Sequence, residues 1–209
     1  MNAFAPLSAQ VLRSLLLPMP PDLPLSPTRS DYDFDPASRP QGQPILLPAA
    51  VLFPIVARAE PTVLFTKRSE DLSRHAGQVS FPGGRADSED GSLVVTALRE
   101  MREETGIAED FVSVVGFLDV YETGTGYAIL PVVGLLREGF VLAPDAREVT
   151  GIFEVPLGFL LDPANCQERT AEWKGRLRRF YAFQYETHYI WGATASILVN
   201  FAERFHDAS

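Results

Sequence analysis

The sequence predicts an α+β fold, in which a mixed sheet carries helices packed on its faces. Apolar segments with strand character outnumber helical segments, one amphipathic helical segment lies between the predicted strands, and another closes the chain. Hydrophobic residues make up 46% of the 209 residues, enough for one sizeable core. This length suits one domain with an appendage.

Prolines set the first 44 residues apart, because nine of the 17 prolines lie there. Residues 7–17 predict a short helix that begins near Ser8 and ends before Pro18. Residues 18–44 predict an extended, partly disordered arm, since proline lacks an amide donor. We expect this arm either to wrap the body or to mediate contacts in a homodimer, with a plain flexible leader as an equal alternative.

A hairpin and a helix are expected next. Apolar runs at 49–57 and 62–68 flank a short polar spacer, which indicates a β-hairpin. A loop is expected over 69–91. Apolar side chains then recur at three- and four-residue spacing, which predicts a helix over Ser92–Thr105 with Gly106 as its C-cap.

The second half of the chain predicts more strands and a terminal helix. Apolar segments at 111–122, 127–136 and 148–161 are typical of strands. The segment 176–192 predicts two strands around a turn near Glu186 and Thr187. The stretch Ala193–Arg204 is amphipathic with helical periodicity and predicts a closing helix.

The charge balance argues against several classes of partner. The chain has 18 Lys and Arg against 27 Asp and Glu, a net charge of −9. Phosphate backbones and anionic membranes attract clustered cations, so we expect no nucleic-acid or membrane partner. No apolar run reaches the roughly 18 residues of a membrane span. A small phosphorylated ligand remains compatible, because a local cationic patch or a bound metal reverses the field.

The single cysteine, Cys166, excludes an intrachain disulfide and a cysteine-based zinc site. It has no helpful basic neighbour, so we expect an ordinary loop thiol rather than a nucleophile. A reducing compartment fits, and the N-terminus lacks the arrangement of a secretory signal peptide. We therefore expect a cytoplasmic protein.

Three acidic residues carry the strongest chemical signal. Glu100, Glu103 and Glu104 stand at positions i, i+3 and i+4, which places them on one face of the predicted helix. Like charges at this spacing repel by about 0.2–0.5 kcal/mol per pair on an exposed helix. Either this face is solvated or a cation compensates it, and Mg²⁺ or Mn²⁺ takes carboxylate oxygens while leaving room for substrate phosphates. From the helix alone, a solvated acidic face is the commoner outcome.

The surrounding motif favours the cation. The stretch Gly84–Ile107, "GRADSEDGSLVVTALREMREETGI", resembles the box of the Nudix hydrolase family, in which a glycine precedes Arg-Glu-U-x-Glu-Glu-x-Gly-U and U is a bulky apolar residue. The second half matches fully. The first half carries one extra residue before Arg99, with Asp90 near the usual first glutamate. Upstream, "LFTKRSEDLSRHAGQVSFPGG" is similar to the signature of the coenzyme A pyrophosphatase branch, with Phe65 as the visible mismatch.

The resemblance implies a Nudix-type α/β/α sandwich with a mixed sheet, in a domain at 44–205 preceded by a Pro-rich helix and arm at 1–43. It implies that a Mg²⁺- or Mn²⁺-dependent enzyme hydrolyses coenzyme A or an acyl-CoA to 3′,5′-ADP and 4′-phosphopantetheine or its acyl form. Two rivals are hydrolysis of another nucleoside diphosphate derivative, such as ADP-ribose, and a non-catalytic binding module. The second rival predicts lost glutamates, yet all three are present.

The resemblance also implies roles around the metal. Glu103 and Glu104 are expected as the main metal carboxylates, with Glu100 as a third ligand or general base. Gly84 is expected either to offer a carbonyl to the metal or to serve as a turn glycine. Arg99 is expected to orient the glutamates by bidentate pairing. Glu148 is either a further carboxylate of the site or a solvated loop acid.

A small cationic patch is expected to bind the substrate. Its members are Arg68 and Arg74, which suit phosphate, together with His75 and Gln78, for which structural roles are equal alternatives. Solvation is favoured for Lys67. Asp87 and Asp90 are expected to cap the helix, and Phe81 and Trp191 are expected in the core.

Overall fold

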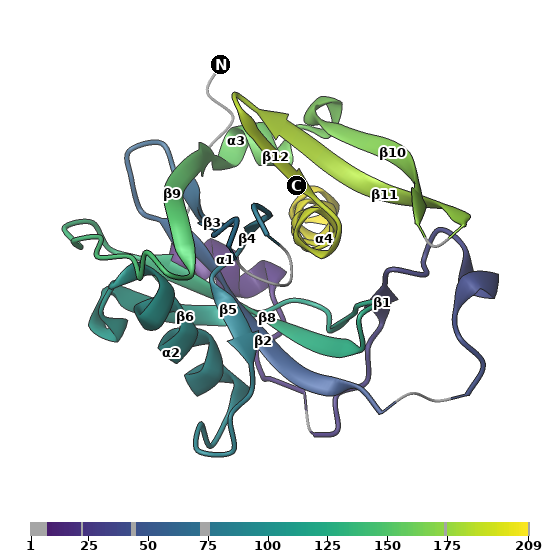
Figure 1. Ribbon diagram of the computed structural model, residues 1–209. Coiled ribbons are helices and arrows are strands. Elements are labelled where there is room, and N and C mark those ends of the chain that lie inside the picture. The colour runs from purple at the N-terminus through teal and green to yellow at the C-terminus, as the bar shows by residue number, and fades with distance from the viewer. Residues whose placement is uncertain (1–7, 22, 43–44, 72–75, 174, 209) are drawn as a thin grey trace.

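A nine-stranded mixed sheet forms the centre of the molecule (Figure 1). The computed structural model describes residues 8–21, 23–42, 45–71, 76–173 and 175–208. The strand order is β1-β7-β8-β2-β3-β4, while β5 pairs with β2, β6 with β8 and β9 with β3. The pairs β2–β8 and β1–β7 are parallel and the others antiparallel, so the predicted mixed sheet is confirmed. The strands are β1 Arg29–Ser30, β2 Leu47–Val56, β3 Thr62–Arg68, β4 Val79–Ser80, β5 Gly83–Arg85, β6 Val112–Phe117, β7 Tyr121–Glu122, β8 Tyr127–Leu136 and β9 Val149–Pro156.

Four α-helices cover the two faces of this sheet, which gives the expected α/β/α sandwich. They are α1 Ala9–Leu15, α2 Leu93–Thr105, α3 Leu157–Leu161 and α4 Ala193–Asp207, with 3₁₀ turns at Pro36–Ser38, Glu109–Phe111 and Pro163–Asn165. Alternation along β2 divides the core: Phe53 and Ile55 pack with α1, α3 and α4, whereas Leu52 and Val56 pack with α2. In the described ranges, no helix combines the length and the apolar character that crossing a membrane requires.

A second, antiparallel sheet of β10 Cys166–Trp173, β11 Arg176–Tyr185 and β12 His188–Trp191 lies beside the first (Figure 1). Helix α4 lies between the two sheets, and its Phe201 packs on Phe53 of β2 with ring centroids 4.8 Å apart. The turn between β11 and β12 falls at Glu186, which has φ 50°, as predicted.

Three local predictions are wrong. The segment 148–161 is not one strand: α3 replaces its end, because Leu157, Leu160 and Leu161 are buried with helical spacing. The expected loop at 69–91 contains β4 and β5. Cys166 is not a loop thiol but begins β10, where burial, aided by Glu168, raises the pKa of its thiol to about 11.

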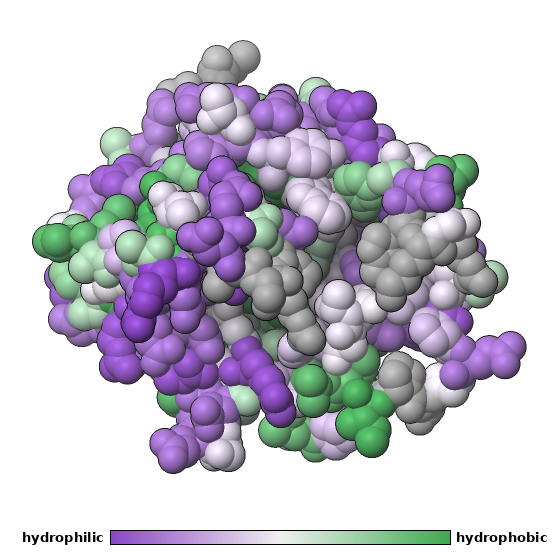
Figure 2. Space-filling model, in the orientation of Figure 1, coloured by the Kyte–Doolittle hydropathy of each residue, from purple (hydrophilic) through white to green (hydrophobic). Residues whose placement is uncertain are grey.

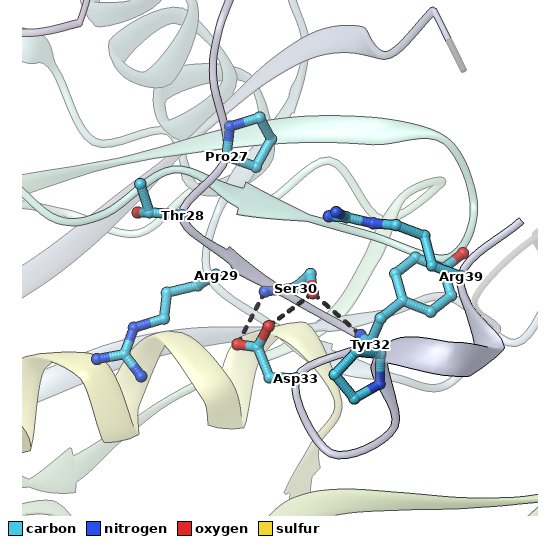
Figure 3. Close-up of a pocket in the computed structure, with 8 residues that line it drawn as sticks. Pro27, Thr28, Arg29, Ser30, Tyr32, Asp33 and Arg39 are labelled. Atoms are coloured by element: carbon cyan, nitrogen blue, oxygen red, sulfur yellow. Dashed lines mark hydrogen bonds between the residues drawn. The ribbon is translucent and has the colours of Figure 1, made fainter. Parts of the chain in front are cut away.

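The described part of the N-terminal arm lies against the body. Ser8 caps α1 by accepting a hydrogen bond from Val11 N, and β1 runs parallel to β7 at the edge of the sheet. Figure 3 shows the turn that follows β1, in which Ser30 and Asp33 bond to one another. Arg29 extends toward α4 and pairs with Glu203 at 2.5 Å. These residues therefore wrap the body rather than forming a plain leader.

Candidate active site

The acidic helix α2 is held by two well-formed ends. Ser92 is the N-cap and accepts a hydrogen bond from Val95 N at 3.3 Å. Gly106 ends the helix with φ 76°, a left-handed conformation that glycine adopts without strain. The expectation that Asp87 and Asp90 cap the helix is therefore wrong. The two caps define where α2 begins and ends, and within it Glu100, Glu103 and Glu104 lie on neighbouring turns.

Asp90 instead fastens the preceding loop to α2. Its buried carboxylate accepts hydrogen bonds from Arg99 Nε at 2.7 Å and Arg99 Nη2 at 2.9 Å. Thr96 Oγ1 and Asp87 N donate to the same group at 2.7 Å and 2.9 Å. The Arg99 guanidinium, above all, holds the pKa of Asp90 well below its usual range. Sequence analysis missed this role, because the partners lie nine residues apart and meet only in the fold.

Arg99, aimed by Asp90, bridges two of the glutamates. Its Nη1 donates to Glu100 Oε1 at 2.8 Å and to Glu103 Oε2 at 2.9 Å. Arg99 therefore contacts both glutamates through a single nitrogen, whereas its bidentate pair is with Asp90 and not with the glutamates as expected. Figure 2 shows hydrophilic side chains gathered at the lower left of the molecule, the region of α2 in Figure 1.

Glu104 is the most deeply buried acid of the cluster, with 2% of its surface exposed. Burial raises its pKa to about 8, an effect that Arg68 partly offsets from 3.6 Å. Thr66 Oγ1 donates to Glu104 Oε2 at 3.3 Å. Burial also raises the pKa of Glu100, in spite of its bond to Arg99. Both acids are thus costly to ionise without a further positive charge beside them.

Gly84 allows Glu100 to approach the backbone of β5. A Cβ built on Gly84 would lie 2.5 Å from the Glu100 carboxylate carbon, so any side chain at this position would force the carboxylate to move. The absence of a side chain at Gly84 therefore lets the Glu100 carboxylate lie against the backbone of β5.

Glu148 joins the cluster from the loop before β9. Its carbonyl accepts a hydrogen bond from Ser69 N at 2.7 Å, which ties it to the end of β3. Its side chain is exposed, and its negative charge raises the pKa of both Glu100 and Glu104. The structure therefore brings Glu148 toward the acidic cluster, although these residues lie far apart in sequence.

The predicted substrate-binding residues are placed only in part. Arg68 is partly buried beside Glu104, and its Nε is buried without a hydrogen-bond partner in the described structure. The carbonyl of Gln78 accepts a hydrogen bond from Arg68 N at 2.9 Å, so the two residues share the end of β3. Arg74 and His75 lie outside the described residues.

A pocket of about 500 Å³ opens beside this strand end, between β3–β4 and the β11–β12 hairpin. Gln78 and Lys67 line one wall, and His188, Tyr189 and Trp191 line the other. Trp191 is 39% exposed, so its expected place in the core is wrong, whereas Phe81 is 2% exposed and does lie in the core. Sequence analysis missed Tyr189, although alternation along "HYIW" indicates that it shares a face with Trp191.

The acidic cluster fits a divalent cation that keeps several waters. In the described part of the chain, no three His, Cys, Asp or Glu side chains form a ready-made metal cage. A cation such as Mg²⁺ needs only one or two carboxylates, because waters and substrate phosphates complete its shell. The buried Glu104 and the partly buried Glu100, beside the side-chain-free backbone of Gly84, supply such a donor set, since a bound cation would favour their ionised form.

The fold and the acidic helix together define a Nudix hydrolase. Residues 46–174 match the family described as NUDIX domain, so the chain belongs to this family, and the predicted enzyme class is confirmed. The chain is 44% identical over 156 residues to "Uncharacterized Nudix hydrolase NudL" of Photorhabdus laumondii, which covers 75% of this chain and 83% of that protein. The protein of the same name from Yersinia enterocolitica is 43% identical and covers 75% and 80%. A MutT protein from Methanosarcina mazei Go1 shares the fold, with a TM-score of 0.51, 19% identity and coverage of 80% of this chain and 98% of that one.

Proposed function

We propose that this Nudix hydrolase cleaves the diphosphate linkage of coenzyme A or an acyl-CoA, giving 3′,5′-ADP and 4′-phosphopantetheine or its acyl form. One observation carries the proposal: the buried Glu104 carboxylate lies 3.6 Å from Arg68, where the acidic helix meets the upstream segment. That segment resembles the coenzyme A pyrophosphatase signature, so the cation-binding acids and the substrate-recognition motif share one place in the fold.

The acidic residues divide the chemical work. A Mg²⁺ or Mn²⁺ ion bound there supplies neutralisation of phosphoryl charge and a water of lowered pKa. Glu103 and Glu104 hold the cation, while Glu100 is either a third ligand or the base that accepts the proton of the attacking water. Burial raises the pKa of Glu100, which makes its carboxylate a stronger base toward the attacking water. The water oxygen forms a new P–O bond, and the bridging P–O bond breaks with its electron pair on the departing phosphate.

The remaining residues orient these groups and the substrate. Arg99 fixes Glu100 and Glu103, Gly84 offers its carbonyl to the cation, and Glu148 adds a carboxylate from the loop before β9. Phosphate binding is assigned to four residues of the upstream segment, namely Arg68, Arg74, His75 and Gln78. Arg68 supports this assignment, because its buried Nε has a hydrogen still to donate.

The cellular setting follows the same proposal. The partner is a small nucleotide substrate in the cytoplasm rather than a nucleic acid or a membrane, as the acidic composition indicates. A homodimer formed through the N-terminal arm is an alternative to a monomer in which the arm only wraps the body.

Parallel turnover assays test the substrate. The full chain is incubated with coenzyme A, acetyl-CoA, ADP-ribose or diadenosine tetraphosphate, with Mg²⁺, with Mn²⁺ or with EDTA. We expect the coenzyme A substrates to give the highest kcat/KM and EDTA to abolish turnover. Preference for ADP-ribose or the dinucleotide would replace the coenzyme A assignment. Binding of all four without turnover would favour a non-catalytic module.

A further inference from the structure

The pocket beside the acidic cluster has the lining of a nucleotide subsite. Tyr189 and Trp191, 40% and 39% exposed, present aromatic surface from the same face of β12. In the described lining Lys67 supplies a cation, and none of the lining side chains is acidic, although the chain has a net charge of −9. An aromatic, locally cationic pocket favours a ligand that is both flat and anionic.

The aromatic wall is held firmly from behind. The His188 ring stacks on Phe153 with centroids 3.5 Å apart, and Phe153 in turn stacks on Phe65 of the core at 5.7 Å. Trp191 contacts Phe180 of the neighbouring strand at 5.5 Å. These contacts orient the wall before any ligand arrives, which reduces the entropy lost on binding.

The two walls of the pocket are tied to one another. Thr194, in the first turn of α4, donates from Oγ1 to the carbonyl of Val79 in β4 at 3.4 Å. Since α4 directly follows β12, this bond holds the hairpin against the strand that carries the opposite wall. This bond links the two sides of the pocket in the structure.

The pocket and the acidic cluster meet at the end of β3. Thr66 and Arg68 contact Glu104, whereas Lys67, between them, lines the pocket, as the alternation of a strand requires. The Cα atom of Lys67 lies about 3.8 Å from those of its two neighbours, Thr66 and Arg68. One ligand that passes around the end of β3 can therefore contact both the pocket and the acidic cluster. Lys67 pairs with the exposed Glu70 at 3.5 Å, a surface contact that a ligand phosphate can displace.

We propose that this pocket binds the nucleoside end of the substrate, with its purine base stacked on Trp191 and Tyr189 and a ribose phosphate facing Lys67. The inference rests on the proposed function, because it assigns the 3′,5′-ADP half of coenzyme A to the pocket and the diphosphate to the acidic cluster. Tyr189 and Trp191 are then the residues that select a nucleotide over a simple diphosphate.

Tryptophan fluorescence tests this assignment without turnover. The variant Trp173→Phe leaves Trp191 as the only tryptophan, and the metal-free protein is titrated with 3′,5′-ADP in EDTA. We expect a saturable change in emission. In the same background Tyr189→Ala should weaken binding by about 5- to 150-fold, the range for losing one stacked ring, while Tyr189→Phe should bind like its parent. Leu177→Ala, an exposed apolar residue of β11 outside the pocket, is the matched control and should change nothing.

Kinetics provide an independent measurement. Trp191→Ala should raise KM for coenzyme A by about tenfold and leave kcat nearly unchanged, because stacking is made equally in the ground and transition states. The inference is overturned if 4′-phosphopantetheine, and not 3′,5′-ADP, changes the emission, or if Tyr189→Ala binds as its parent does. Binding of 3′,5′-ADP by a protein that fails to hydrolyse coenzyme A would support the pocket and refute the proposed function, so the two failures are distinguishable.

Discussion

Replacing Asp90 by Asn tests whether the buried pair with Arg99 holds the acidic helix to its loop. The substitution keeps the shape of the side chain and one carbonyl oxygen, which can still accept from Thr96 Oγ1 and Asp87 N. It removes the negative charge and replaces the oxygen that accepts from Arg99 Nε by an NH2 group, which cannot accept a hydrogen bond. Breaking a fully buried pair costs about 3–5 kcal/mol, and the 23% exposure of the Arg99 side chain brings the expected cost below that range, to about 2–3 kcal/mol.

Thermal and urea unfolding at pH 7 measure this cost. For a chain of this size, about 2–3 kcal/mol corresponds to a fall in Tm of roughly 4–12 °C. Asp145→Asn is the control, because Asp145 also pairs with Nε and Nη2 of one guanidinium, that of Arg147, but in a solvent-exposed pair. We expect the control to unfold like the wild type. If Asp90→Asn is as stable as Asp145→Asn, the pair does not fasten the loop.

The difference in the free energy of unfolding between the wild type and Asp90→Asn should depend on pH in a definite direction. The folded pKa of Asp90 lies below its unfolded value of about 3.9, so its stabilisation is complete above that value. The wild type should therefore exceed Asp90→Asn by a constant margin between pH 5 and 8. The margin should shrink as the pH falls below about 4, since the unfolded wild type then binds a proton that the folded state excludes.

Three further predictions concern the acidic cluster. Glu104→Gln should lower kcat by orders of magnitude. Because the folded pKa of Glu104 is raised to about 8, the metal-free wild type should lose stability as the pH rises from about 4.5 to 8. Urea unfolding of metal-free Glu104→Gln should not show this loss. Gly84→Ala should abolish turnover because its Cβ meets Glu100 at 2.5 Å, whereas Gly151→Ala, whose Cβ has 3.7 Å of room, should be as active as wild type. Mg²⁺ at about 100 times its Kd should stabilise the protein by about 2.7 kcal/mol, an increment in calorimetry that EDTA removes and Glu104→Gln diminishes.

The parts of the fold that follow from local pattern could be predicted from the sequence. Helix α2 combines helical periodicity with a Gly C-cap, and it forms within one residue of the predicted start. The strand β10 could not be predicted, because "CQERTAEW" is largely polar and gains its pairing only from β11. The helix α3 is too short, at five residues, for its spacing to stand out from a strand.

The same distinction applies to the candidate site. Glu100, Glu103 and Glu104 are set by spacing within one helix, so the sequence alone placed them on neighbouring turns. Glu148 reaches the cluster only because β9 pairs with β3, where Arg68 lies opposite Val149. The exposure of Trp191 depends on where the small sheet stands relative to β4. Contacts of this kind arise from tertiary packing, for which a single sequence carries no periodic signal.

The end of β3 explains why charge neutralisation and base recognition can occupy one small region. Thr66 and Arg68 stabilise the Glu104 carboxylate on the α2 face, and Lys67 serves the aromatic pocket on the α4 face. A strand has this property because successive side chains point to opposite sides. A substitution in the pocket should therefore change substrate choice without disturbing the acids, since the two sets of side chains share a backbone but no contact among those described here.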